Sequence, residues 1–300
     1  MDDLKPYTLE NAPAQNSIPF DACDISEFVA LNEIIDFCLG FNTDHIRAIE
    51  RPEKNYTSPE YCIDRQYFDP SVCSIIERLI PICRNYKAIS AFIEKSNVPS
   101  IYNFGLVAQA LGSALGAILQ DYRLLLLDIE RQFNKNDLSL QKLLFYLEGP
   151  SSLFAFLTAQ IIDPVSNQKL SGCGYSSKSK EVECIVEFIL EACYAPVFEI
   201  AANWVKTGQL VDPLGDFFIQ EDVTLKKEDL IEDFNSNYWS EKFSIINEYV
   251  PALFRSDNLQ TMILMTGKYV YTLKECSSQY RFLEYPQIEL IYKSGDTSKA

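Results

Sequence analysis

The sequence predicts an all-α fold. Over most of residues 72–276, apolar side chains recur every three or four positions, which is the spacing of one face of an α-helix. Hydrophobic residues make up 47% of the 300, enough to fill a sizeable core, and only 11 are glycine. The strict apolar–polar alternation of a half-buried strand is weak throughout.

Residues 1–70 are expected to form an acidic, partly disordered arm. Residues 1–50 hold ten acidic side chains and only two basic ones, Lys5 and Arg47. Their net charge of −8 is half of the formal net charge of −16. The arm is either solvated or a docking segment for a basic or helical partner. Because residues 1–50 are expected to aid recruitment more than folding, deleting them should leave thermal stability nearly unchanged.

A short helix fits residues 24–39 of this arm, where apolar side chains have helical spacing. Asp24 is a candidate N-cap, and Gly40 lies just past the expected end. Residues 51–70 contain three prolines and are typical of a linker.

Two long helices follow. The first spans residues 72–95, and Pro81 should kink or divide it because proline lacks an N–H and crowds the preceding turn. The second runs roughly from Tyr102 to Phe133. Large apolar residues form one stripe along it, and small residues that would let another backbone approach form a second: Gly105, Ala108, Gly112 and Gly116.

The uncharged stretch 96–120 is long enough to cross a membrane. Asn103, Gln109 and Ser113 interrupt it, and no basic cluster marks a cytoplasmic end. The amphipathic pattern also continues beyond it, so we expect a core helix and no membrane span.

The later helices are expected at residues 140–148, 151–162, 180–207, 238–250 and 256–276. Ser139 can cap the first of them and Gly149–Pro150 should close it, while Pro196 should divide the helix 180–207. The inner side of the last helix is expected to carry Leu259, Met262 or Ile263, Thr266, Tyr269 or Val270, and Leu273.

The residues offer little for catalysis, so no catalytic, cofactor-binding or metal-binding residue is predicted and the protein is not expected to be an enzyme. His45 is the single histidine and lies in a segment expected to be loosely ordered, which disfavours a catalytic triad or a Cys/His zinc site. The acidic group Asp229, Glu232 and Asp233 is better explained as a solvated face. Nine cysteines without a Cys-x-x-Cys spacing favour reduced thiols, and the net charge of −16 disfavours nucleic acid.

The most specific motif is the run 195–219, an apolar helix that ends in glycine, a Val-Asp-Pro turn and a short aromatic segment. Its marker residues are Pro196, Trp204, Gly208, Asp212, Pro213, Asp216, Phe217, Phe218 and Ile219. Two further markers follow, the pair Tyr238–Trp239 and the triplet Gly267, Lys268 and Tyr269. In this order the motifs resemble the amino-terminal domain of the gamma-tubulin complex component family, over roughly residues 72–285, and the run 138–147 is most similar to one of its members.

The resemblance implies an elongated stack of helical bundles over residues 71–300. It further implies a structural scaffold in the cytoplasm and cytoskeleton, at a microtubule-organising centre such as a centrosome or spindle pole body. Such a scaffold would make lateral contacts with other components, with component 3 as the expected neighbour, and so template microtubule nucleation. Small helical or tethering partners also fit, whereas gamma-tubulin would be held only by a second domain that this sequence lacks.

The marker residues are expected to be core and turn residues more than partner contacts, because large aromatics are usually buried. Lys242 stands where the family usually has arginine, so an ion pair there should lack bidentate geometry. The alternative function is a general helical adaptor unrelated to tubulin, which explains the composition equally well but not the ordered motifs.

Overall fold

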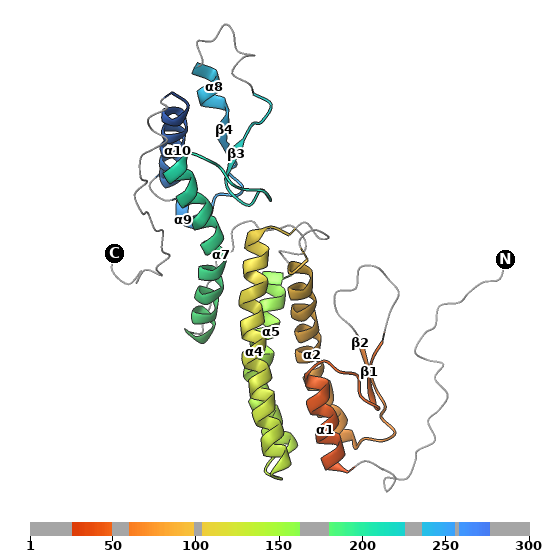
Figure 1. Ribbon diagram of the computed structural model, residues 1–300. Coiled ribbons are helices and arrows are strands. Elements are labelled where there is room, and N and C mark those ends of the chain that lie inside the picture. Colours follow the sequence, from red (N-terminus) through yellow and green to blue (C-terminus); the bar gives the residue numbers. More distant parts are fainter. Residues whose placement is uncertain are drawn as a thin grey trace, which may run out of the picture. The chain divides into compact units, whose positions relative to one another are not determined.

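A computed structural model confirms that the chain is all-α (Figure 1). It describes residues 26–49, 60–98, 104–162, 180–225, 236–255 and 258–276. The chain divides into two compact units, one of residues 1–84 and 126–149 and one of residues 85–125 and 150–300. The expected domain boundary at residue 70 and the stacking of the bundles stay predictions.

The longer helices are α1 (Glu27–Cys38), α2 (Pro70–Ser96), α4 (Leu106–Asn134), α5 (Leu140–Leu157), α7 (Lys180–Thr207) and α10 (Leu259–Cys276). The shorter ones are the π-helical turn η2 (Thr158–Ile162), α8 (Ser236–Glu241) and α9 (Ala252–Arg255). Helices α2, α4 and α5 each contribute residues to both units.

Three helices continue through a proline at which the sequence predicts a kink, a break or an end. Pro81 lies inside α2, Pro150 inside α5 and Pro196 inside α7. An internal proline removes one backbone hydrogen bond and costs about 3 kcal/mol or more. In α7 the next two side chains, Val197 and Phe198, are buried in the core, so tertiary packing of one continuous face offsets that cost. The predicted division at Pro196 and the predicted end at Gly149–Pro150 are therefore wrong.

Unit 1 contains α1 and an antiparallel hairpin of β1 (Ile46–Ile49) and β2 (Glu60–Ile63). The register pairs Ile46 with Ile63. The cap of α1 is Ser26, whose side chain accepts from the N–H of Val29, whereas the candidate cap Asp24 lies outside the described residues. Gly40 follows the helix with φ +86°, a left-handed conformation that closes a helix without strain in glycine.

Helix α1 is part of the core of unit 1, although the sequence predicts that residues 1–50 serve recruitment more than folding. Ile34, Phe37 and Cys38 are fully buried, and Ile46 of the hairpin is buried as well. The ring of Phe37 meets that of Tyr61 edge-on, with centroids 4.9 Å apart. The amphipathic pattern therefore marks a helix that packs against its own hairpin.

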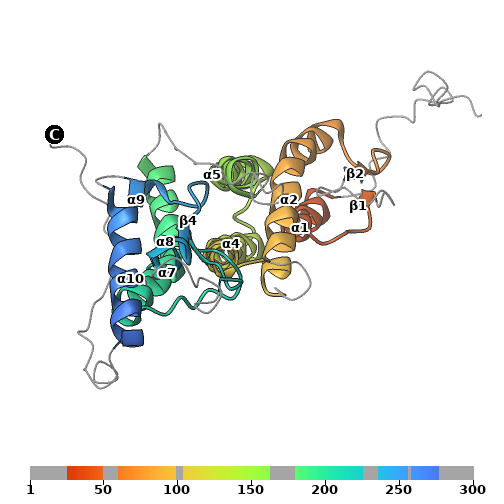
Figure 2. The ribbon, with the colours of Figure 1, turned by 90° about the horizontal axis from the view of Figure 1, so that it is seen from above.

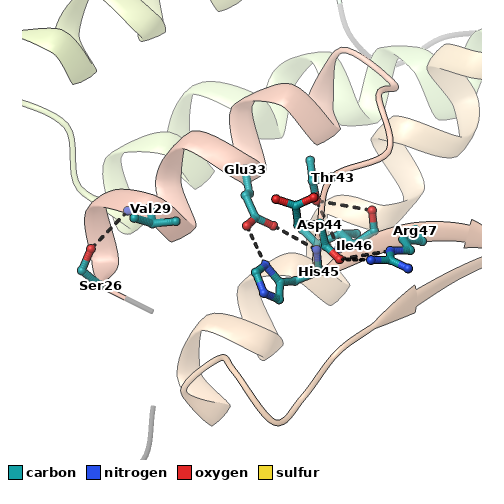
Figure 3. A network of polar contacts seen from close by, with 8 residues as sticks. All are labelled: Ser26, Val29, Glu33, Thr43, Asp44, His45, Ile46 and Arg47. Atoms are coloured by element: carbon teal, nitrogen blue, oxygen red, sulfur yellow. Dashed lines mark hydrogen bonds and ion pairs between the residues drawn. The ribbon is translucent and has the colours of Figure 1, made fainter. Parts of the chain in front are cut away.

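Polar contacts also join α1 to the residues before β1 (Figure 3). The largely buried carboxylate of Glu33 lies 2.7 Å from Nδ1 of His45 and accepts from the backbone N–H of the same residue at 3.4 Å. Thr43 closes the adjoining turn, because its Oγ1 accepts from the N–H of Ile46 at 3.1 Å. The single histidine thus lies in an ordered structural contact.

Helix α4 buries the large stripe that the sequence predicts, including Leu111, Leu115, Tyr122 and Ile129. By length and composition it is the one helix in the described part of the chain that could cross a membrane. In this structure the stripe faces other residues of the protein, as in the core helix of a globular domain.

The line of small residues that starts at Gly105, just before α4, and continues along the helix is closely approached at two of its glycines. A methyl group on Gly105 would overlap the carboxylate of Asp216, and one on Gly112 would overlap Ser96. Gly116 faces open space, so the predicted close approach is wrong at this position.

In unit 2, α10 lies beside α7, and β3 (Ile219–Glu221) pairs with β4 (Phe243–Ile245) next to them (Figures 1 and 2). The strands are antiparallel, with Ile219 opposite Ile245. The sequence predicts a helix over 238–250, but the chain leaves α8 at Glu241 and enters β4. The buried residues of these elements and of the segments between them form one core cluster: Val197, Phe198, Ile200, Ala201, Trp204, Phe217, Phe218, Ile219, Phe243, Val250, Phe254 and Ile263.

The burial of α1 predicts that Phe37→Ala lowers the free energy of unfolding by about 3–5 kcal/mol, since the side chain is 0% exposed and its removal leaves a cavity. The matched control is Phe41→Ala, whose ring is 61% exposed and which should change stability by less than about 0.5 kcal/mol. Urea unfolding of the whole chain measures both. Equal stability of the two variants would show that α1 is not part of the folded core.

Candidate functional site

The marker residues of the family motif converge where the end of α7 crosses α10. The indole of Trp204 is fully buried, and its Nε1–H donates to the backbone carbonyl of Ile263 at 3.0 Å. Gly267, one turn further along α10, leaves the space that the indole fills, because a methyl group there would overlap the ring. The hydrogen bond satisfies the one polar atom of a large apolar side chain, so the contact is both tight and directional.

Gly208 brings the two helices together a second time. It follows the last residue of α7 with φ +63°, a conformation that few other residues adopt without strain. A Cβ on Gly208 would lie 2.5 Å from the backbone nitrogen of Tyr271. We call Trp204, Gly208, Ile263, Gly267 and Tyr271 the α7–α10 lock.

The aromatic segment after the turn packs under this lock. Phe217 and Phe218 are buried, with ring centroids 4.4 Å apart, and Phe218 lies 5.4 Å from the ring of Phe254 on α9. Phe243 of β4 lies 4.7 Å from the ring of Trp204. The ends of the paired strands β3 and β4 thus carry aromatic side chains into the core that the two helices share.

The turn between α7 and β3 is held by Asp212. One carboxylate oxygen accepts from the N–H groups of Gly215 at 3.0 Å and Asp216 at 3.1 Å, and the other accepts from Phe217 at 2.9 Å. Three backbone donors on one side chain fix the path of the loop into the aromatic segment. Pro213 is exposed in the same turn.

Asp216 binds the N-terminus of α4. Its Oδ2 accepts from the N–H of Val107 at 3.4 Å, one of the donors that the first turn of a helix leaves free. Burial raises the pKa of this carboxyl, and the nearby Asp212 adds to the rise, while the backbone N–H groups of Val107 and Leu106 act in the opposite direction. At this half-buried site the charged carboxylate is therefore less stable, relative to the protonated form, than it would be in water.

Lys242 lies at the centre of a polar cluster between α8, β3 and α10. Its Nζ donates to the hydroxyls of Tyr238 at 2.9 Å and Tyr271 at 2.8 Å, and it lies 3.4 Å from Oε1 of Glu221. Burial opposes the charge, but the two hydroxyls outweigh it and raise the pKa of Lys242. The sequence predicts that an ion pair at this position lacks bidentate geometry. Lys242 makes three separate contacts instead, one with each of these three side chains.

Of the remaining marker residues, Trp239 and Lys268 lie beside this cluster. The ring of Trp239 meets that of Tyr238 edge-on at 4.9 Å, and Lys268 donates to the carbonyl of Ser240 at 2.8 Å, where burial lowers its pKa. Pro196 is half-buried within α7, and Tyr269 is exposed on the outer side of α10. Motif reasoning missed Tyr271, whose only signal is its place one turn after Gly267.

The contacts at this site are those of a structural joint. Among the described residues, no group of three His, Cys, Asp or Glu side chains is placed to hold a metal ion, and Asp229, Glu232 and Asp233 lie outside them. Burial raises the pKa of Cys193 in α7 to about 12, which keeps this thiol protonated and unreactive.

Known proteins share this domain. The family model for the gamma tubulin complex component N-terminal domain matches residues 31–299. The chain is 29% identical to gamma-tubulin complex component 2 of Arabidopsis thaliana over 286 residues, covering 91% of this chain and 41% of the relative. It is 28% identical to component 2 of Mus musculus over 260 residues, covering 83% of this chain and 28% of the relative.

A further relative is the spindle pole body component alp4 of Schizosaccharomyces pombe, which is 24% identical over 306 residues. That match covers 83% of this chain and 38% of the relative. The chain thus spans less than half the length of the curated relatives it matches. The resemblance inferred from the ordered motifs is confirmed, and component 2 is the member that the run 138–147 resembles.

The close contact at Gly267 predicts that Gly267→Ala destabilises the protein by about 1–3 kcal/mol, because the new methyl group must displace the buried indole of Trp204. Gly116→Ala is the matched control in the same unit, also within a helix but facing open space. It should be neutral or stabilise the protein by up to about 1 kcal/mol, since alanine is the better helix former. Chemical denaturation compares them, and a stable Gly267→Ala protein would contradict the packing described.

The burial of Asp216 predicts a pH-dependent effect of Asp216→Asn. A carboxyl whose pKa is raised on folding stabilises the protein below its unfolded pKa of about 3.9, and this contribution is lost as the pH rises through the folded value. Asparagine keeps an acceptor for the N–H of Val107 without the charge. The variant should therefore gain thermal stability relative to the parent between pH 4 and pH 7, whereas Asp121→Asn, at an exposed site, should show no such trend.

Proposed function

The chain belongs to the gamma-tubulin complex component family, and from that membership we propose that it is a structural scaffold module of the gamma-tubulin complex. In this proposal its helical domain makes lateral contacts with a homologous component, and those contacts set the spacing of the template from which a microtubule grows. The observation that carries the proposal is the match of the family's amino-terminal domain to residues 31–299.

The arrangement of the motif residues supports a mechanical role. A template keeps its geometry only if its supports resist bending, and the α7–α10 lock joins two helices through a buried indole, a directional hydrogen bond and close backbone contact. Removing a buried aromatic of this size costs about 3–5 kcal/mol, so local loosening of the joint is rare at equilibrium. Residues that take part in no chemical reaction can therefore still be essential to the function.

We further propose component 3 as the lateral neighbour and a microtubule-organising centre, a centrosome or spindle pole body, as the location. The relatives named as component 2 and as a spindle pole body component support this assignment. Contact with gamma-tubulin is assigned to residues outside this domain, and small helical or tethering proteins are the further partners that the proposal allows.

The proposal predicts a complex between this chain and the amino-terminal domain of component 3. Light scattering after size exclusion should show a species with the summed mass of the two, in a concentration-dependent equilibrium. A helical protein of similar size and charge from another family, mixed in the same way, serves as the control. If the two domains elute with their separate masses at the highest concentration that stays soluble, lateral assembly through this domain is wrong.

Affinity capture from cell extract separates this function from the general helical adaptor. A scaffold module should recover other subunits of the gamma-tubulin complex. An adaptor unrelated to tubulin should recover none of them above the level seen with an empty resin.

A further inference from the structure

Helix α10 has two apolar faces, and only one of them is buried in the core. Ile263 and Gly267 face α7, and Leu264 and Tyr271 are partly buried beside them. The other face is the outer stripe, which consists of Leu259, Met262, Met265, Tyr269 and Leu273. At 100° per residue these five side chains lie within an arc of about 120°.

The sequence predicts that this outer stripe points inward, because Leu259, Met262, Tyr269 and Leu273 belong to the expected inner side of the last helix. The structure contradicts this expectation, since each of the four side chains is at least 37% exposed. Helix α10 contacts α7, α9 and β4, and in Figure 2 α7 and β4 lie on the same side of it. Both faces have helical spacing, so packing alone distinguishes them.

The exposed area of the stripe is large for the surface of a monomer. With exposed fractions from 37% to 62%, the five side chains present on the order of 500 Å² to solvent, close to the largest apolar patch of a typical soluble protein. If two such stripes covered each other, they would bury about 1,000 Å² in total, which is the lower limit for a specific interface. The area therefore fits a weak, reversible contact between two copies.

The stripe can leave water without burying an unpaired polar group of its helix. Between Leu259 and Leu273 no charged residue lies within its arc, and the one hydroxyl besides that of Tyr269 belongs to Thr266. The Thr266 hydroxyl already donates to the carbonyl of Met262 at 2.7 Å. Methionine and tyrosine are enriched at protein interfaces, and charged residues are depleted from their centres.

The charge of the chain restricts where a second copy can approach. The formal net charge is −16, so two copies repel each other over most of their surface. Residues 258–276 differ from the rest, because they carry two lysines, Lys268 and Lys274, and a single acid, Glu275. An identical uncharged stripe of the same length is complementary to this face, and contact there brings no acidic group within the arc against another.

We propose that the outer stripe of α10 is a self-association surface, on which a second copy of this chain packs with its own outer stripe about a two-fold axis. Such a contact uses the same face of both copies and therefore closes at a dimer. The inference goes beyond the proposed scaffold function and does not depend on it, because both partners are copies of this chain.

Sedimentation equilibrium of the full chain over a range of concentrations tests the proposal. It should show monomers and dimers with a dissociation constant of about 1–100 μM, as expected for a small interface. Met262→Ser with Tyr269→Ser should weaken the dimer at least tenfold. The matched control, Phe145→Ser with Val223→Ser, removes side chains that are 73% and 81% exposed elsewhere on the chain and should leave the dissociation constant unchanged.

Salt provides a second measurement on the unmodified chain. Because salt screens the repulsion between two acidic copies and does not weaken an apolar contact, a higher salt concentration should tighten the dimer. A dimer that weakens with salt would show that ionic groups make the contact, and the proposal would be wrong.

Three further outcomes would overturn the proposal. They are a parent chain that stays monomeric at the highest soluble concentration, a dimer that persists in the stripe variant, and assembly beyond the dimer. A large loss of thermal stability in the stripe variant, at concentrations where the parent is monomeric, would also refute it, since the chain would then cover its own stripe. If this chain stays monomeric alone but binds the domain of component 3, the self-association is wrong and the scaffold function stands.

Discussion

The structure of unit 2 depends on one contact, the indole of Trp204 in the space left by Gly267. The residue types are linked, because a side chain at Gly267 would exclude the ring and a smaller residue than tryptophan would leave a void. The hydrogen bond to the carbonyl of Ile263 sets the rotation of the ring and so the register of α7 against α10. In this register, Gly208 meets α10 at Tyr271 and Phe243 of β4 meets the indole of Trp204.

Buried polar groups position the loops around this apolar centre. Asp212 organises a turn through three backbone N–H groups, and Asp216 binds the start of α4, more than a hundred residues earlier in the chain. Lys242 joins α8, β3 and α10 through two phenol oxygens and a carboxylate. Each group is costly to bury without partners, so the partners restrict the loops to one arrangement. This restriction explains why the family motif includes polar residues, which packing of the apolar core alone would not require.

A joint of this kind suits a protein whose task is to hold others at fixed spacing. Such a function depends on the geometry of the helices. It is lost when the helices change their relative position, not when one reactive group is removed. The marker residues therefore need not touch a partner to matter for assembly. In the function proposed above, they keep the lateral surface in shape from within the domain.

The sequence by itself determined the helical class, the approximate extent of α1, α4 and α10, and the family. These follow from periodicity and from motif order, which are local properties of the chain. It could not determine which apolar face of α10 is buried, because both faces have helical spacing and only the position of α7 distinguishes them. The prolines within α2, α5 and α7, the three-residue strands β3 and β4, and the contacts of Lys242 were likewise decided by tertiary structure. In each case the deciding energy comes from residues far apart in the chain, and no local pattern records it.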